Sequence, residues 1–189
     1  SSIYGLNKIP FRESDDAQTP ISIYAATKRA GELIAHNYCH LFGLNITCLR
    51  FFTVYGPWGR PDMSPHTFTS AILKGEPITL YNNGNMKRDF TYIADVVSGV
   101  LAALKKPLGF TIFNIGNDTN VKLIEYIRAI ESASDKKAII NFKPLQAGDV
   151  KDTHADIRKA RKILGYNPKT GIQDGMKEFV AWYRRYYKL

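Results

Sequence analysis

The sequence predicts an α/β fold, because segments typical of strands alternate with segments typical of helices along its 189 residues. The clearest example is an apolar helical pattern over residues 22–42, which is followed directly by a β-rich run over residues 45–52. Hydrophobic residues make up 44% of the chain, which is enough for the sizeable core of one domain or a little more.

The first third of the chain predicts a loop, a helix, a strand and a second loop. Residues 10–20 are polar and acidic, as is usual in a loop, and the helix over residues 22–42 ends before Gly43, a common stop. Residues 45–52 are expected to form a buried strand. Residues 55–62 are rich in Gly and Pro and cannot form a regular element, because proline lacks an N–H donor and fixes the backbone.

A β-hairpin is expected in the middle of the chain. Residues 78–81 are typical of a short strand, and the four residues from Asn82 to Asn85 are a turn signal because Asn and Gly tolerate positive φ. Residues 88–93 would be the return strand. The other elements alternate, with helices at 65–74, 94–105 and 123–132, strands at 110–115 and 138–142, and helices at 156–164 and 171–187.

Charge and composition narrow the class of protein. Lys and Arg outnumber Asp and Glu by 26 to 17, and the net charge of +9 fits nucleic acid, a membrane surface or a phosphorylated ligand. Most of the basic residues are dispersed, which disfavours nucleic-acid binding. No apolar run approaches the roughly 20 residues of a membrane span, so a cytoplasmic protein without membrane contact is expected. Cys39 and Cys48 lack zinc spacing, so no metal site is predicted and both are expected to be small core residues.

Tyr24 and Lys28 form a Tyr-x-x-x-Lys pair, one turn apart on the same face of the first helix. A cation within roughly 4–6 Å of a phenol favours the phenolate and lowers its pKa by about 1–3 units, so Tyr24 could take a proton from a sugar hydroxyl. The same spacing also occurs by chance in many helices, where it means one core tyrosine and one surface lysine.

Further motifs stand around this pair in a fixed order. Ser1-Ser2-Ile3-Tyr4-Gly5 precedes it, and residues 49–57, 87–93 and 148–150 follow it. In this set the chain resembles the extended short-chain dehydrogenase/reductase superfamily, specifically its nucleotide-sugar epimerases and dehydratases. The resemblance implies the C-terminal part of a Rossmann-like fold with NAD as the cofactor, plus a small α/β domain that binds the substrate.

The resemblance also implies a division of the chain. Residues 1–56 are expected to be the C-terminal part of the NAD-binding Rossmann domain, and residues 57–189 mainly the nucleotide-sugar-binding domain, with some elements returning to the Rossmann sheet. No G-x-G-x-x-G phosphate motif occurs, although this family has it at the N-terminus. Most of the dinucleotide-binding sheet is therefore expected to be absent, as in a fragment that does not turn over alone.

The segment from Thr53 to Met63 selects among the members of this group. It looks like the UDP-glucuronate 4-epimerases, whereas UDP-galactose 4-epimerases usually have Asn-Pro where Thr53-Val54 stands. An Arg60 fork held in a rigid Pro/Gly/Trp loop suits a sugar C6 carboxylate, which it can meet through two parallel hydrogen bonds. The other interpretation of Arg60 is a surface loop arginine.

The family implies a mechanism for a UDP-uronic acid. Tyr24 removes the O4 proton while hydride passes from C4 to NAD, and hydride returns to the opposite face after the 4-keto sugar rotates. Lys28 would stabilise the phenolate and hold the nicotinamide ribose, and Phe51 and Val54 would be further cofactor contacts. Because a 4-keto uronate is a β-keto acid that easily loses CO₂, Thr53 and Arg60 are expected to hold the carboxylate so that this loss is disfavoured.

Other substrate contacts are also implied by the resemblance. Arg88 is the leading diphosphate contact, with an ion pair to Asp89 as the alternative. Asp149 is expected to bind the ribose. Phe68 and Tyr81 are expected to line the uracil slot, unless they are core aromatics.

The N-terminal serines need separate treatment. Alignment on Tyr4-Gly5 places the catalytic Ser or Thr of the superfamily just before Ser1, so Ser1 is a catalytic candidate only with that reservation. Ser2 then flanks the catalytic position and is expected to contact the uronate.

Alternatives stay open at this point. UDP-glucuronate decarboxylases and other nucleotide-sugar 4-epimerases or dehydratases share these motifs. A module that binds a nucleotide sugar without catalysis is an answer of a different class. The expected partner is a UDP-sugar, and a homodimer is expected only by analogy, since the helix over residues 22–42 resembles one that pairs across a dimer in this superfamily.

Overall fold

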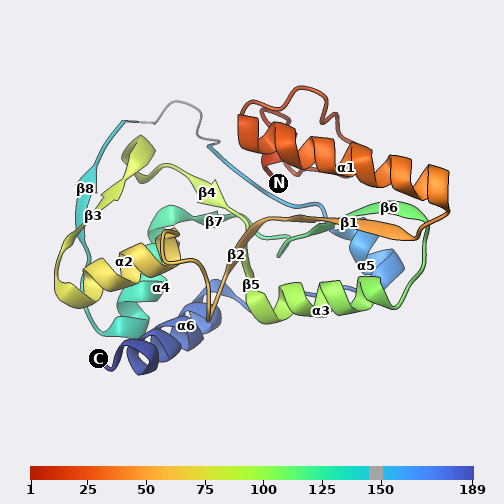
Figure 1. Ribbon diagram of the computed structural model, residues 1–189. Helices are drawn as coiled ribbons and strands as arrows, with labels where there is room; N and C mark the ends of the chain where they lie inside the picture. Colours follow the sequence, from red (N-terminus) through yellow and green to blue (C-terminus); the bar gives the residue numbers. More distant parts are fainter. Residues whose placement is uncertain (145–150) are drawn as a thin grey trace.

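The computed structural model describes residues 1–144 and 151–189, which form two regions joined by short strands (Figure 1). In the first region, a parallel pair of strands lies between helices on both faces, an arrangement typical of α/β proteins. The strands are β1 (Ile46–Phe51) and β6 (Phe110–Ile115), with α1 (Ile23–Phe42) on one face and α3 (Ile93–Leu104) and α5 (Arg158–Leu164) on the other.

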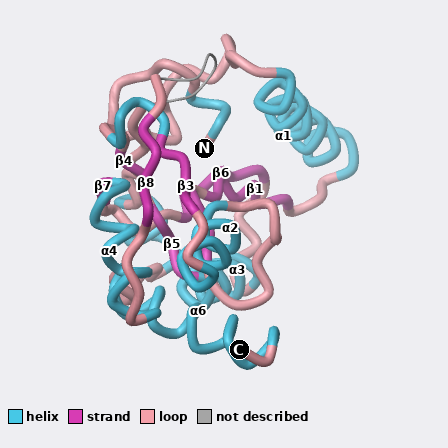
Figure 2. Tube along the Cα trace, turned by 90° about the vertical axis from the view of Figure 1, so that its left-hand side faces the viewer, coloured by secondary structure: helices cyan, strands magenta, loops and turns pink. Residues whose placement is uncertain are grey.

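The second region contains another parallel pair, β3 (Pro77–Leu80) and β8 (Ile139–Phe142), with α2 (Ser64–Lys74), α4 (Leu123–Ser134) and α6 (Ile172–Tyr187). α4 packs against both α2 and α6, and α1 lies well away from these three helices in both views (Figure 2). Between the regions, β2 (Thr53–Tyr55) pairs in parallel with β5 (Phe90–Tyr92), and β4 (Lys87–Arg88) pairs antiparallel with β7 (Val121–Lys122). Two 3₁₀ helices, η1 (Ser2–Tyr4) and η2 (Tyr81–Gly84), complete the structure.

Each region has its own hydrophobic core. Phe52 and Phe113 are buried in the first core, whereas Tyr55 and Phe90 are buried in the second. Burying a side chain of this size stabilises the fold by roughly 1.5–3 kcal/mol. Since Phe52 and Tyr55 are only three residues apart, β2 is anchored in both cores and lies at their junction.

The long helix α1 forms where the sequence predicts it. Ser22 caps its first turn, because the Ser22 hydroxyl accepts a hydrogen bond of 3.1 Å from the backbone N–H of Ala25. Gly43 ends the helix with a positive φ of 64°, which a residue without Cβ adopts at little cost. Its apolar positions, however, are largely exposed, and the residues that α1 buries are Ala25 and Glu32.

The predicted β-hairpin is wrong. β3 pairs in parallel with β8, with Pro77 opposite Ile139 and Leu80 opposite Phe142. Asn82 and Asn83 do adopt positive φ, as the turn signal predicts, but within η2 rather than in a two-residue hairpin turn. The proposed return strand is divided between β4 and β5. β4 pairs with β7 and β5 pairs with β2, so the partners of these strands are not the neighbouring strand β3 that the hairpin required.

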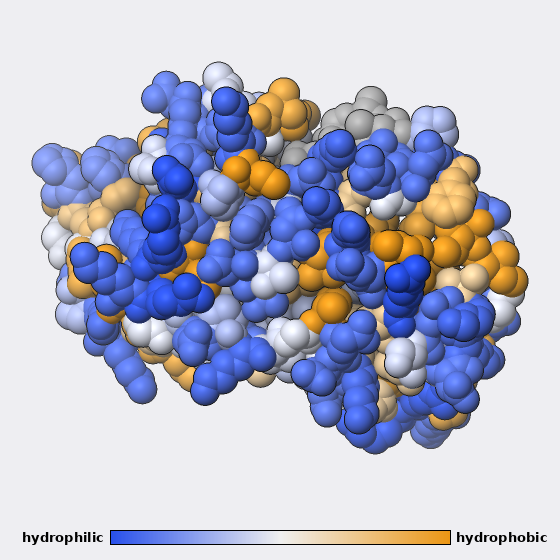
Figure 3. All heavy atoms as spheres, turned by 180° about the vertical axis from the view of Figure 1, so that it is seen from behind, coloured by the Kyte–Doolittle hydropathy of each residue, from blue (hydrophilic) through white to orange (hydrophobic). Residues whose placement is uncertain are grey.

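The surface is polar over most of its rear face, with apolar patches between the hydrophilic side chains (Figure 3). Among the described residues, none of the helices combines the length and apolar character needed to cross a membrane. The sequence predicted that Cys39 and Cys48 are core residues, but both are free thiols that are only half-buried.

Candidate active site

One cavity of about 660 Å³ gathers most of the residues singled out from the sequence. It lies where η1, the end of β1, β2 and the first turns of α1 and α2 meet. The walls come from both regions, because Tyr24 belongs to α1 and Arg60 to the loop after β2. Seven predicted site residues line it: Ser1, Ser2, Tyr24, Phe51, Thr53, Val54 and Arg60.

Tyr24 projects from the first turn of α1 into this cavity and is 60% exposed. One turn further on, the Lys28 ammonium lies 5.2 Å from the centre of the Tyr24 ring. Lys28 does not line the cavity itself. The helix therefore brings the phenol and the ammonium together, as the spacing predicts.

The Arg60 guanidinium already holds a carboxylate. Its Nε donates to Asp62 Oδ1 at 3.1 Å and its Nη2 donates to Asp62 Oδ2 at 2.5 Å. Both side chains are exposed, and the pair holds the pKa of the Asp62 carboxyl below its ordinary value, chiefly through these hydrogen bonds. The Arg60 fork is thus shaped for a carboxylate, and a ligand that carries one competes with Asp62 for it.

The loop before Arg60 has an uncommon backbone. Gly56 has a φ of 140°, and a Cβ there would clash with Ile93, so only glycine fits. Trp58 has a φ of 63°, which is rare for a bulky residue. Trp58 and His66 both line the cavity, although sequence analysis did not name either as a site residue. Trp58 stands within the recognised motif, whereas His66 gave no sequence signal beyond its place on the next helix.

The serines and the end of β1 form the opposite wall. The backbone nitrogen of Ser1 donates a 2.7 Å hydrogen bond to the carbonyl of Phe51, and Ser2 lies beside it in η1. This bond holds Ser1 against the end of β1. Ser2, Phe51 and Val54 thus face the same space as Tyr24.

The residues predicted to bind the nucleotide lie elsewhere. Phe68 packs against the second core, where its ring is 6.2 Å from that of Tyr126, and Tyr81 begins η2. Arg88 Nη1 donates to the carbonyls of Lys87 and Lys151, at 3.0 and 2.7 Å. None of these three lines the cavity, and Asp149 lies outside the described residues.

Asp89 is a structural anchor. Its fully buried carboxylate accepts hydrogen bonds from the Thr91 hydroxyl at 3.1 Å and from the backbone N–H groups of Asn117 at 2.7 Å and Ala155 at 3.0 Å. Burial raises the pKa of this carboxyl, and the hydrogen bonds act in the opposite direction. These contacts give Asp89 a structural role, and the interpretation of Arg88 as a diphosphate contact stays a prediction.

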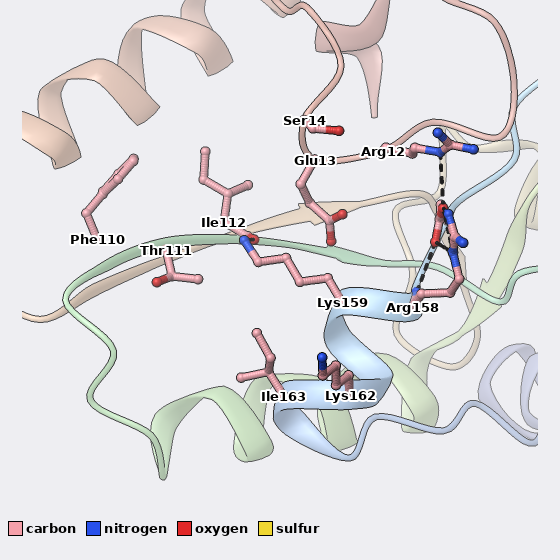
Figure 4. Close-up of a pocket in the computed structure, with 11 residues that line it drawn as sticks. Arg12, Glu13, Ser14, Phe110, Thr111, Ile112, Arg158, Lys159, Lys162 and Ile163 are labelled. Atoms are coloured by element: carbon pink, nitrogen blue, oxygen red, sulfur yellow. Dashed lines mark hydrogen bonds and ion pairs between the residues drawn. The ribbon is translucent and has the colours of Figure 1, made fainter.

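A second cavity, of about 680 Å³, lies between residues 12–14, β6 and α5 (Figure 4). It is rich in basic side chains, but Arg12 and Arg158 share the carboxylate of Asp156, and Lys159 donates to the carbonyl of Ile112 at 2.8 Å. No residue singled out from the sequence as a site residue lines it. The Tyr24 cavity is therefore the candidate active site.

Comparisons with known proteins identify the family of the chain. The model of a family described as "NAD dependent epimerase/dehydratase family" matches residues 1–116. UDP-glucuronate 4-epimerase 4 of Arabidopsis thaliana is 49% identical in an alignment of 205 residues, gaps included. The alignment covers 99% of this chain and 47% of that protein. An uncharacterized protein of Methanocaldococcus jannaschii is 54% identical over 184 residues, covering 97% of this chain and 56% of that one.

A solved structure is also similar. The UDP-glucuronic acid 4-epimerase of Bacillus cereus, in complex with UDP-glucuronic acid and NAD, aligns with a TM-score of 0.92 at 36% identity. The alignment covers 99% of this chain and 60% of that chain, and it confirms the predicted Rossmann-like epimerase fold. The chain spans about half the length of the curated relatives that it matches. From these matches, the 189-residue chain belongs to the NAD dependent epimerase/dehydratase family.

Proposed function

We propose that the protein carrying this chain is an NAD-dependent UDP-sugar 4-epimerase, and that it converts UDP-glucuronate to UDP-galacturonate through a 4-keto intermediate. The observation that carries this proposal is the meeting of Tyr24, Thr53 and Arg60 in one cavity. These side chains offer a candidate base, a hydroxyl and a carboxylate-binding fork. The names of the Arabidopsis thaliana and Bacillus cereus relatives support a uronate as the substrate.

The residues present fit one end of the proposed cofactor. Tyr24, Phe51 and Val54 line a cavity whose volume lies in the range of roughly 300–1,000 Å³ usual for small-molecule sites. They suit the nicotinamide and its ribose, whereas the sequence has no glycine-rich motif for the pyrophosphate. When bound, NAD would accept hydride from C4 of the sugar and return it.

The acid–base step belongs to Tyr24 in this proposal. Its exposed side chain, as the phenolate, can take the O4 proton, and the ammonium of Lys28 lies 5.2 Å from the centre of the ring and can hold the ribose. The same phenol gives the proton back to O4 at the end of the reaction. Ser2 is proposed to contact the uronate, and Ser1 remains a catalytic candidate with the reservation given above.

Thr53 and Arg60 are proposed to keep the C6 carboxylate in place. In the 4-keto intermediate, loss of CO₂ breaks the C5–C6 bond and sends its electron pair towards the C4 ketone, and a proton then adds at C5. This requires the C5–C6 bond to align with the ketone π system. Two hydrogen bonds from Arg60 would hold the carboxylate out of that alignment and would favour its charge.

We propose that other residues bind the diphosphate, ribose and uracil of the nucleotide sugar. Arg88 is proposed to bind the diphosphate, and its hydrogen bonds to the Lys87 and Lys151 carbonyls would orient the guanidinium. Asp149 is proposed for the ribose, and Phe68 and Tyr81 for the uracil. We also propose a homodimer through α1, which the exposed apolar side chains of this helix support.

The first test asks whether the 189-residue chain by itself is a module that binds the nucleotide sugar without NAD. UDP and NAD are titrated calorimetrically into the 189-residue chain. Micromolar UDP binding without NAD binding would support a module that binds the nucleotide sugar, and tight NAD binding would exclude that alternative.

The second test concerns turnover by the protein that carries the chain. Tyr24→Phe should lower kcat about 10²–10⁴-fold, the usual contribution of general acid–base catalysis, while Tyr38→Phe on the same helix should not. Chromatography of the products then identifies the reaction. UDP-galacturonate is expected, and a UDP-pentose as the main product would show a decarboxylase instead. Wild-type turnover by Tyr24→Phe would contradict the assignment of the base.

A further inference from the structure

The loop that carries Arg60 is attached to the C-terminal helix. We call residues 56–63 the Arg60 loop. The Trp58 ring lies 5.5 Å from that of Trp182 and 5.4 Å from that of Tyr186, measured between ring centres. Trp182 and Tyr186 are one turn apart on α6 and stack on each other at 5.3 Å, so they offer Trp58 one continuous aromatic surface.

A second attachment follows directly after the loop. His66 on the first turn of α2 has its ring 5.6 Å from Trp182 and 5.3 Å from Phe179. His66 is only 5% exposed, and its Nε2 has no hydrogen-bond partner among the described residues. Aromatic packing and a hydrogen bond to the Gly59 backbone therefore hold the imidazole, and both ends of the segment from Trp58 to His66 contact Trp182.

The backbone of the Arg60 loop makes these attachments necessary. A φ of 63° at Trp58 is unfavourable for a bulky residue and persists only where the surroundings hold it. Two turns shape the rest of the loop: the Gly59 N–H donates to the Gly56 carbonyl, and the Met63 N–H donates to the Arg60 carbonyl, both at 3.2 Å. Ring contacts with α6 are the interactions that oppose the strain at Trp58.

Arg60 has no anchor of its own in either core. Its side chain is 74% exposed, and its hydrogen bonds go to Asp62 within the same loop. The Arg60 loop therefore sets the position of the guanidinium, and the contacts with α6 set the position of the loop. Neither Trp182 nor Tyr186 lines the cavity, so an effect of Tyr186 on a ligand must pass through Trp58, and an effect of Trp182 must pass through Trp58 or His66.

We propose that Trp182 and Tyr186 are positioning residues for Arg60, and that through Trp58 they set the preference of the site for a sugar carboxylate. The proposal rests on the proposed function, in which Arg60 binds the C6 carboxylate. It adds a specificity determinant on the C-terminal helix, more than 100 residues beyond the loop in the sequence.

The test compares a sugar with a carboxylate and one without it. The protein that carries the chain is titrated calorimetrically with UDP-glucuronate, UDP-glucose and UDP. Trp58→Gly removes the ring and leaves a residue that tolerates the positive φ, and Tyr186→Ala removes one of its supports. Each variant should reduce the ratio of the UDP-glucuronate to the UDP-glucose affinity by about 2- to 12-fold, the range of one aromatic pair. The affinity for UDP should not change.

Controls separate positioning from general damage. Leu101→Ala removes a side chain of α3 that is as exposed as Tyr186, 52% in both cases, and should keep the preference. Tyr186→Phe keeps the ring and should keep the wild-type preference for UDP-glucuronate. The double variant Trp58→Gly/Tyr186→Ala should lose no more preference than Trp58→Gly alone, because removal of the Trp58 ring already removes its contact with Tyr186.

The results distinguish the two proposals. A wild-type protein that prefers UDP-glucuronate, together with Tyr186→Ala and Trp58→Gly variants that keep the preference, would overturn the positioning role alone. A wild-type protein that binds UDP but does not prefer the uronate would overturn the uronate assignment, and the positioning role with it. Additive losses in the double variant would also contradict action through Trp58.

Discussion

Replacing Glu32 by Gln is expected to remove much of the stability of the first region. Glu32 on α1 and Arg50 on β1 are 8% and 6% exposed, and they form a two-pronged ion pair: Arg50 Nε donates to Oε1 at 2.7 Å and Nη2 donates to Oε2 at 2.9 Å. Arg50 also donates to the Tyr4 hydroxyl at 2.9 Å, and this hydroxyl donates to Asn114 Oδ1 at 2.6 Å. Because Ala25 and Glu32 are the residues that α1 buries, this pair is the main polar attachment of the helix that carries Tyr24.

The magnitude follows from leaving Arg50 charged in a buried place. Removing one partner of a buried ion pair costs about 3–5 kcal/mol, and Glu32→Gln adds no cavity because the shapes match. A domain of this size has a total unfolding free energy of about 5–15 kcal/mol, so the loss is a large part of it. At about 2–4 °C per kcal/mol, the Tm should fall by roughly 6–20 °C.

The assay is urea unfolding followed by far-UV circular dichroism. Arg29→Met is the control, since the Arg29 side chain is more exposed than that of Arg50, 27% against 5%, and donates one hydrogen bond to Glu32, at 2.8 Å; its loss should cost about 1 kcal/mol or less. Glu32→Leu combined with Arg50→Met should recover most of the loss, because well-packed apolar residues can replace a buried pair. A loss below about 1 kcal/mol for Glu32→Gln would refute the reasoning.

The Glu32–Arg50 pair should also make the free energy of unfolding depend on pH in acid. Burial alone would favour the neutral form of Glu32, but the hydrogen bonds from Arg50 and Arg29 outweigh it and hold the pKa below its ordinary value of 4.5. The stabilisation is then complete above pH 4.5 and disappears as the pH falls through the lowered pKa. The difference between wild type and Glu32→Gln should therefore shrink in acid, and a difference independent of pH would contradict the ion-pair account.

Three further predictions concern other parts of the molecule. Gly175→Ala should cost about 1–3 kcal/mol in unfolding measurements because its Cβ would clash with the Tyr55 hydroxyl, whereas Gly31→Ala, with open space around it, should stabilise α1 by about 0.5–1 kcal/mol. Asp62→Asn should free the Arg60 fork and tighten UDP-glucuronate binding about 1.4- to 5-fold, the range for an exposed pair, with UDP-glucose binding unchanged in calorimetry. Burial lowers the pKa of His66, so its neutral form is favoured in the folded state, and the Tm should fall more steeply below pH 6.5 in wild type than in His66→Phe. Equal slopes would contradict that account of His66.

Much of the fold could be predicted from the sequence, because helix ends carry local signals. Ser22 and Gly43 bound α1 within one residue of the expected helix, and β6 has the expected bounds. Strand pairing carries no such signal. The run from Asn82 to Asn85 has the residues of a hairpin turn, yet β3 finds its partner in β8, about 60 residues further along the chain. The neighbouring residues predict the positive backbone angles of this run, but they do not predict which strand pairs with β3.

The site divides in the same way. Tyr24, Thr53 and Arg60 could be predicted because their motifs have characteristic spacing, and they do line one cavity. The engagement of Arg60 by Asp62 and the contact of Trp58 with Tyr186 could not, since both depend on side-chain packing that the motif does not encode. The roles of the residues in the cavity remain predictions, as does the division of the chain at residue 56.

The cavity lies where the two regions meet, so its shape depends on how these regions are held together. Tyr24 stands on the first region, and Arg60 rests through Trp58 on α6 in the second. Asp89 links the two regions, because its carboxylate accepts hydrogen bonds from the backbone of Asn117 and Ala155 in the first region while its neighbour Phe90 is buried in the second core. A base and a carboxylate-binding fork are thus brought to one substrate by elements that fold around different cores. Changes at Asp89 should therefore alter the relative positions of Tyr24 and Arg60 without touching either side chain.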